Sequence, residues 1–113
     1  MDDCLFCKIC RGEIPSAKLY EDEEILAFKD IDPQAPIHFL VVPKRHITSA
    51  AELTPEDGPL LGNIYAAIAR ICAEQGVKDG YRVVTNVGRD GGQSVSHLHF
   101  HVLAGRQLGS PPG

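Results

Sequence analysis

The longest regular pattern of apolar residues runs through the middle of the chain. Between residues 54 and 76 apolar side chains recur at spacings of three and four, at Leu61, Ile64, Tyr65, Ile68, Ile71 and Cys72. This spacing predicts one buried stripe of an amphipathic helix, with Gly76 as its C-terminal stop. Thr54 to Asp57 resembles a capped first turn, whereas Pro59 would remove a hydrogen bond from the second, which favours a regular helix beginning nearer residue 59.

Shorter segments have the composition of strands. Residues 18–21 and 25–29 flank an acidic turn and predict a hairpin, and the apolar run at 37–43 predicts a third strand because Pro33 and Pro36 exclude a helix before it. Residues 81–85 and 95–104 predict two more strands joined by a glycine-rich loop. With a short helix around residues 5–12, these elements indicate the α+β class.

Length and charge narrow the classes of protein. The 113 residues, 43% of them hydrophobic, are enough for one core, so we expect a single domain over residues 1–113. The net charge of −4 and the absence of a basic run argue against nucleic-acid binding. The sequence shows neither a leader nor a stretch that would span a bilayer, so we expect a cytoplasmic protein with no membrane partner.

Histidine alternates with apolar residues near the C-terminus. His97, His99 and His101 account for three of the five histidines, and period-two alternation puts them on one face of the predicted strand. Leu98 and Phe100 then point the other way, as does Val102, toward the stripe of the long helix. Polar residues on a solvated sheet face or a transition-metal cluster are the alternatives to a catalytic group.

The cysteines crowd at the other end of the chain. Cys4 and Cys7 have the spacing of a metal knuckle, but no second close pair follows, so this is not a zinc finger. Cys10 does not complete an iron–sulfur motif, because a fourth cysteine is missing from the required position. A metal site with ligands from distant sequence and a set of free thiols both remain open.

The histidine segment, His97 to Leu103, resembles the signature of the histidine triad (HIT) superfamily, in its Hint branch of purine nucleoside phosphoramidases. The resemblance covers nearly the whole chain and includes the segments 13–15, 27–28, 30–31, 33–36, 38–40, 43–46, 91–95 and 111–113. It implies the HIT fold, an antiparallel sheet of about five strands with one long and one short helix. It also implies a homodimer paired through the long helix and the neighbouring edge strand.

The resemblance assigns catalytic roles. His99 matches the family's nucleophile, and imidazole suits attack on phosphorus because one of its nitrogens is unprotonated over much of the physiological pH range. His101 would hydrogen-bond the phosphate oxygens, Ser94 would lie near the scissile nitrogen, and His38 would support a proton relay. For His38, a hydrogen-bonded core histidine is the alternative.

The same resemblance implies a purine nucleotide as the substrate. An apolar slot for the base would be formed by Phe6, Ile9, Phe28 and Ile31, which without the triad would be taken as ordinary core. Asp30 would accept hydrogen bonds from the ribose hydroxyls. The glycine-rich loop with Gln93 and Ser94 would direct backbone N–H groups toward phosphate, and Asn86 would help position it.

Some relatives hold a structural zinc ion, and the matching ligands here are Cys4, Cys7, His46 and His97. Two other functions stay open beside phosphoramidate hydrolysis. One is cleavage of dinucleoside polyphosphates, which shares the histidine nucleophile and differs in the leaving group. The other is a non-catalytic, zinc-stapled nucleotide-binding or interaction protein.

Three positions depart from the family pattern. Ser110 stands where relatives commonly have a tryptophan before the final Pro-Pro-Gly, and the chain has no tryptophan. Lys29 stands where relatives often have histidine, and Ser96 where an aromatic residue is common. The contacts to the leaving group and the rim of the pocket are therefore expected to differ, while the reacting residues are all present.

Overall fold

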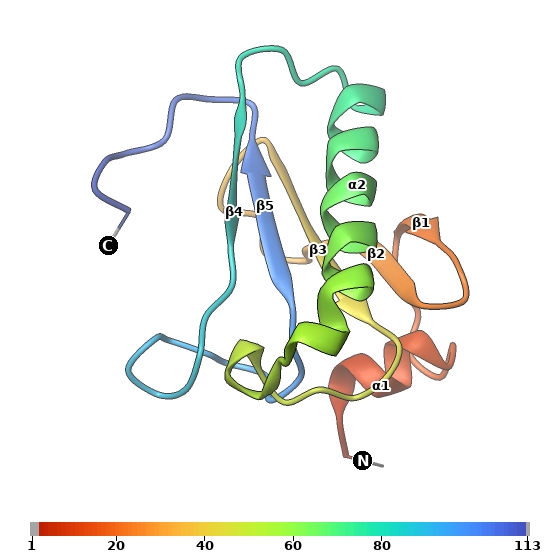
Figure 1. Ribbon diagram of the computed structural model, residues 1–113. Helices are drawn as coiled ribbons and strands as arrows, with labels where there is room; N and C mark the ends of the chain where they lie inside the picture. Colours follow the sequence, from red (N-terminus) through yellow and green to blue (C-terminus); the bar gives the residue numbers. More distant parts are fainter. Residues whose placement is uncertain (1–2, 113) are drawn as a thin grey trace.

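The centre of the computed structural model, which describes residues 3–112, is a five-stranded antiparallel sheet (Figure 1). Its spatial order is β1-β2-β3-β5-β4, and the strands are β1 (Lys18–Glu21), β2 (Ile25–Lys29), β3 (Ile37–Pro43), β4 (Tyr81–Val84) and β5 (Phe100–Ala104). Two α-helices accompany it, α1 (Leu5–Cys10) and α2 (Gly58–Glu74). The predicted α+β class, the strand number and the one long and one short helix are confirmed.

Helix α2 lies along one face of the sheet (Figure 1). Its buried stripe includes Ile64 and Ile68, which share a core cluster with Leu98, Phe100 and Val102. The predicted packing of the histidine segment's apolar side against the long helix is therefore confirmed. Within residues 3–112, no helix combines the length and the hydropathy needed to cross a bilayer.

The opposite face of the sheet carries α1. Phe6 and Ile9 of this helix form a second cluster with side chains from β2 and β3, namely Leu26, Phe28, Leu40 and Val42. Phe28 and Leu40 are direct cross-strand partners, as are Leu40 and His101. Because partners in a ladder point to the same face, His101 belongs to the face covered by α1.

The ends of α2 follow the sequence signals. A 3₁₀ turn at Pro55–Asp57 with a Thr54/Asp57 capping box precedes the helix, which becomes regular at Gly58. The capping pattern at Thr54 to Asp57 thus marks the 3₁₀ turn, and Pro59 lies in the first turn of the helix that follows it. At the far end Gly76 has a φ of +78°, the left-handed conformation that favours glycine at a helix stop.

The prediction of a strand over residues 95–104 is wrong in its first half, since β5 begins only at Phe100. The ladder with β3 ends at the Val41–Phe100 pair, and Pro43 further along has no N–H to continue it. The Pro43 carbonyl instead accepts a hydrogen bond from the ring of His97. His97 and His99 therefore lie in the irregular segment that precedes the strand, and His101 alone of the three lies in the strand.

Candidate active site and metal centre

His99 is buried, with 3% of its surface exposed, and has a fixed ring orientation. Its Nδ1 lies 2.7 Å from the backbone oxygen of His97. A carbonyl oxygen only accepts, so Nδ1–H is the donor and the lone pair of the neutral ring is on Nε2. The edge of the Phe6 ring packs against the imidazole, with ring centroids 5.0 Å apart. His99 thus has one unprotonated nitrogen held in place by its neighbours.

His38 and His101 form a hydrogen bond whose donor and acceptor can be assigned. The backbone N–H of Gln34 donates to Nδ1 of His38 over 3.0 Å, which leaves the proton of the neutral ring on Nε2. That atom lies 2.9 Å from Nδ1 of His101 and donates to it. His101 must then carry its own proton on Nε2. Burial has the largest effect on the pKa of His101 and lowers it below the usual 6.5, and the neighbouring His99 and His38 lower it further. The ring is therefore neutral at pH 7.

Asp30 flanks this pair. Its Oδ1 accepts a hydrogen bond from the N–H of Asp32 over 2.8 Å, and its Oδ2 lies 3.4 Å from Nε2 of His38 and 4.0 Å from Nδ1 of His101. The sequence predicted a ribose contact for this carboxylate. The structure also brings it close to the two histidines, where its negative charge acts to raise the pKa of His101 against the larger effect of burial.

A cavity of about 330 Å³ opens beside His99 and His101. Eight of the predicted site residues line it, namely Phe6, Ile9, Phe28, Asp30, Ile31, Ser94, His99 and His101. The side chain of Ile31 is fully exposed, so it forms the rim of the cavity and not its interior. Apolar walls with a few polar groups at one end are typical of a nucleoside site.

Gln93 is turned away from this cavity. Its Nε2 donates to the carbonyls of Thr48 (2.7 Å) and Val95 (3.0 Å), and its Oε1 accepts from the N–H of Gly88 (2.9 Å). The N–H groups of Gly92 and Gln93 bind carbonyls inside the loop. The Gln93 side chain therefore stabilises the loop, and two of the N–H groups of the loop expected to face phosphate are bonded within it.

Two further predicted residues lie outside the cavity lining. Asn86 is half-buried in the loop after β4, and His38 contacts the site through His101 and Asp30. The sequence reasoning missed several lining residues, among them Ile14, Pro15 and Leu40. Leu40 was predictable in principle, because a 25–29 strand paired with the 37–43 strand puts it opposite Phe28.

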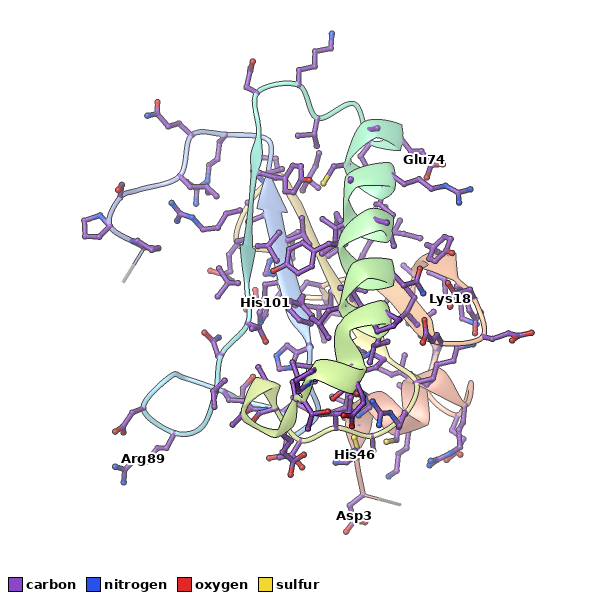
Figure 2. All side chains as sticks on the ribbon, in the orientation of Figure 1. Asp3, Lys18, His46, Glu74, Arg89 and His101 are labelled. Atoms are coloured by element: carbon purple, nitrogen blue, oxygen red, sulfur yellow. The ribbon has the colours of Figure 1, made fainter. Side chains whose placement is uncertain are left out.

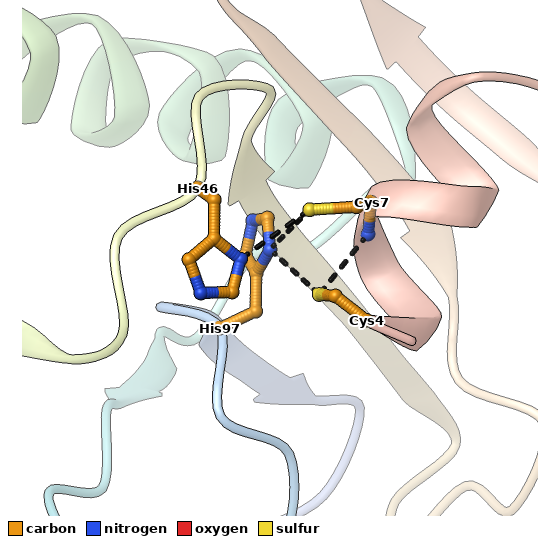
Figure 3. Close-up of side chains that lie close together, drawn as sticks. All are labelled: Cys4, Cys7, His46 and His97. Atoms are coloured by element: carbon orange, nitrogen blue, oxygen red, sulfur yellow. Dashed lines mark hydrogen bonds between the residues drawn. The ribbon is translucent and has the colours of Figure 1, made fainter. Parts of the chain in front are cut away.

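The four predicted metal ligands meet at the start of α1 (Figure 3). Their donor atoms lie within 4.8 Å of one another. Cys4 Sγ is 3.2 Å from His97 Nδ1, and Cys7 Sγ is 3.3 Å from His46 Nδ1 and 3.5 Å from His97 Nδ1. Cys4 also caps α1 by accepting from the N–H of Cys7. Residues 93 positions apart are thus brought into one cluster.

This donor set fits a tetrahedral metal ion. A zinc ion with Zn–S bonds of about 2.3 Å and Zn–N bonds of about 2.0 Å would hold sulfur and nitrogen about 3.6 Å apart. His97 Nε2–H donates to the Pro43 carbonyl over 2.8 Å, so its Nδ1 faces the sulfurs without a proton. Burial, and then hydrogen bonding to Cys4, raises the pKa of Cys7 to about 11, so a cation would have to displace its proton.

His97 connects the two clusters. Its ring belongs to the Cys4/Cys7/His46 group, while its backbone oxygen accepts the hydrogen bond from His99 Nδ1–H. Phe6, between the two cysteines in sequence, makes T-shaped ring contacts with both imidazoles and with Phe28. The segment that bears the thiols therefore also forms a wall of the cavity.

Comparisons with known proteins agree with this arrangement. A family model described as "Scavenger mRNA decapping enzyme C-term binding" matches residues 3–110. An uncharacterized HIT-like protein of Synechococcus elongatus is 49% identical over 112 residues, covering 99% of this chain and 98% of that protein. Protein HitA of Neisseria gonorrhoeae is 47% identical over 103 residues, covering 91% and 96%.

Solved structures show the same fold. A HIT family hydrolase from Legionella pneumophila superposes with a TM-score of 0.95 at 48% identity, over 98% of this chain and all of that one. A histidine triad protein from Clostridium difficile gives a TM-score of 0.93 at 48% identity, over 97% and 96%. The fold and the histidine cluster thus define a histidine triad protein. This chain belongs to the HIT superfamily.

Proposed function

We propose that this protein is a nucleotide-binding hydrolase that cleaves nucleoside 5′-phosphoramidates of adenosine and guanosine, as in the Hint branch. The observation that carries the proposal is the free Nε2 lone pair of His99 beside an apolar cavity with a hydrogen-bond donor, His101 Nε2–H, next to it. The similarity to a HIT family hydrolase supports the same class of reaction.

In the first step His99 Nε2 attacks the phosphorus and forms a nucleotidyl-histidine. The P–N bond breaks, and its electron pair leaves with the nitrogen. The departing nitrogen takes up a proton from solvent, with Ser94 at the edge of the cavity beside it, while His101 Nε2–H hydrogen-bonds a phosphate oxygen. His38 orients His101 through their shared hydrogen bond.

In the second step a water molecule attacks the phosphorus and loses a proton to solvent. The bond to His99 breaks, the nucleoside monophosphate is released, and His99 returns to its starting state. The Phe6, Ile9 and Phe28 side chains would hold the base, with Ile31 at the rim and Asp30 near the ribose. Gln93 acts on the phosphate indirectly, by stabilising the loop after β4, and Asn86 in the same loop is proposed to help position the phosphate.

We further propose that Cys4, Cys7, His46 and His97 hold a structural zinc ion, because two thiolates and two imidazoles fill a tetrahedral site. Bound there, the metal would cross-link the start of α1 to the segment that carries His99. Its four protein ligands leave no position for substrate, which makes the role structural.

The test compares adenosine and guanosine phosphoramidates with dinucleoside polyphosphates as substrates. Faster turnover of the phosphoramidates supports the proposal, and a preference for the polyphosphates assigns the other leaving group. Turnover of neither class would leave a nucleotide-binding protein without catalysis and overturn the proposal.

A rapid quench followed by intact mass measurement tests the nucleophile. Wild-type protein should gain the mass of one nucleotide, and His99→Ala should not, because no other nitrogen at the phosphorus is unprotonated and oriented. His99→Ala should keep its affinity for nucleoside monophosphate, since the cavity walls are unchanged. Near-normal turnover by His99→Ala would contradict the mechanism.

A further inference from the structure

The loop between β2 and β3 sets the direction of the hydrogen bonds between His38 and His101. The backbone N–H of Gln34 in this loop donates to Nδ1 of His38 over 3.0 Å, which leaves the proton of that ring on Nε2, facing His101. Gln34 is not among the residues that line the cavity. Any group that holds Gln34 in place therefore acts on the site from outside the cavity.

The segment that follows β5 provides such a group. His101, labelled in Figure 2, lies on β5, and this strand leads directly into Gly105 and Arg106. Nη2 of Arg106 donates a hydrogen bond to the carbonyl oxygen of Gln34 over 3.1 Å. Both backbone groups of Gln34 are thus engaged, the carbonyl by Arg106 and the N–H by His38.

A close backbone contact supports the same junction. Gly105 has a φ of +96°, and a Cβ at this position would lie 2.8 Å from Cβ of Pro36 in the loop. Glycine therefore allows the two segments to approach each other in a conformation that other residues rarely adopt. Arg106 also donates from Nη1 to the carbonyl of Gln107, so its guanidinium joins the C-terminal segment to the loop.

The opposite direction of the hydrogen bonds would remove the donor that faces the substrate. Without the Gln34 N–H, the His38 ring is free to carry its proton on Nδ1, and its bare Nε2 then needs a proton on Nδ1 of His101. The neutral His101 ring would be left with a lone pair on Nε2. A lone pair cannot hydrogen-bond a phosphate oxygen, so His101 would no longer hold the phosphorus in place for attack by His99.

We propose that Arg106 is a positioning residue, because it holds Gln34, whose N–H fixes the tautomer of His38. His101 then follows, since its Nδ1 accepts from that ring. The effect on the reaction rate rests on the proposed phosphoramidate hydrolysis, whereas the tautomers can be measured without a substrate.

The experiment compares full-length wild-type protein with Arg106→Ala and Arg106→Lys. Long-range proton–nitrogen NMR spectra should place the proton of His38 on Nε2 in wild-type protein, and should show a second tautomer of both rings in Arg106→Ala. In a rapid quench with adenosine 5′-phosphoramidate, nucleotidylation of His99 should be roughly five- to tenfold slower in Arg106→Ala, because a displaced contact to the phosphate costs rate. The affinity for nucleoside monophosphate should not change. Arg106→Lys keeps a donor and should recover most of the rate.

Arg82→Ala is the matched control, since the Arg82 guanidinium donates to the carbonyl of Gly109 in the same C-terminal segment and does not line the cavity. It should keep the wild-type tautomers and rate. A wild-type tautomer in Arg106→Ala would overturn the positioning role and leave the proposed hydrolysis intact, as would an equal loss of rate in Arg82→Ala. If wild-type protein forms no nucleotidyl-histidine, the proposed hydrolysis is wrong, and the NMR spectra then decide whether Arg106 orients His38.

Discussion

At the scale of the residue, one hydrogen bond decides what each histidine is able to do. His97 donates from Nε2 and turns Nδ1 toward the thiols, while His99 donates from Nδ1 and keeps Nε2 free. His38 accepts at Nδ1 and donates from Nε2 to His101. In each case the partner that sets the tautomer is a backbone group, which no side-chain substitution removes directly.

The first prediction at this scale concerns the protonation of His101. Burial, more than the neighbouring His99 and His38, lowers its pKa below the usual 6.5. The folded protein therefore binds this proton less readily than the unfolded chain, so the contribution of His101 to stability is present above about pH 6.5 and is lost as pH falls. In NMR titrations the ring signal of His101 should have its midpoint below pH 6.5; a midpoint above that value would show that Asp30 outweighs burial.

The second prediction concerns the cysteines. Purified wild-type protein should contain about one zinc ion per chain, and Cys4→Ser with Cys7→Ser should lose the metal and melt at a lower temperature, because metal affinity is folding free energy here. Cys10→Ser is the matched control, since Cys10 is half-buried on the same helix outside the cluster. Metal analysis that finds no zinc in carefully prepared wild-type protein would leave a pair of free thiols.

At the scale of the element, one carboxylate joins the β1–β2 turn to α2. Asp22 accepts hydrogen bonds from the N–H groups of Glu24 and Ile25, from the Tyr20 hydroxyl and from the side chain of Asn63. Partial burial alone would raise the pKa of Asp22, but these donors outweigh it and lower the pKa to about 2. The turn and the helix are thus held by the ionised form.

Asp22→Ala should lower the free energy of unfolding at pH 7 by about 2 kcal/mol, because hydrogen bonds to a charged group are lost. The folded pKa of Asp22 lies below its usual value of 3.8, so its contribution is present above about pH 4 and disappears as pH falls toward 2. Denaturant unfolding at several pH values measures both effects. Glu23→Gln, on the same turn, should change little, and a loss of similar size in that variant would contradict the assignment to Asp22.

At the scale of the whole molecule, one face of the sheet forms the main core and the other carries the candidate site. The face under α2 is a closed apolar core, and the face under α1 carries the cavity, the histidine pair and the Cys/His cluster. Side chains from the first ten residues and from the last strand meet on this second face. The outer edge of β4 has no partner strand among the described residues.

We expect this edge and α2 to form the homodimer implied by the family resemblance. Tyr65 on α2 and Tyr81 on β4 are exposed by 51% and 43%, which is consistent with a covered surface in an assembly. The mass in solution at micromolar concentration should equal two chains, and Tyr65→Glu should shift it toward one. Val87→Glu, which adds the same charge on the loop after β4, should not; a single-chain mass for wild-type protein would refute the dimer.

The sequence alone determined the elements and the two faces. Period-two alternation put Leu98 and Phe100 against the long helix, and the three-and-four spacing gave the stripe on which they pack. These patterns are readable because burial acts on every residue of an element in turn. The membership of His46 and His97 in one cluster with Cys4 and Cys7 also followed from the sequence, through the resemblance to the family.

Only the tertiary structure decided the directions of the hydrogen bonds. Pro43 ends the ladder and receives the His97 ring, so His97 and His99 leave the regular strand that alternation predicted for them. The Gln93 amide group hydrogen-bonds backbone carbonyls around the loop, and Asn86 is not among the residues that line the cavity. Such outcomes depend on which backbone carbonyl from a distant segment lies nearby, and a local pattern of residue types carries no information about that contact.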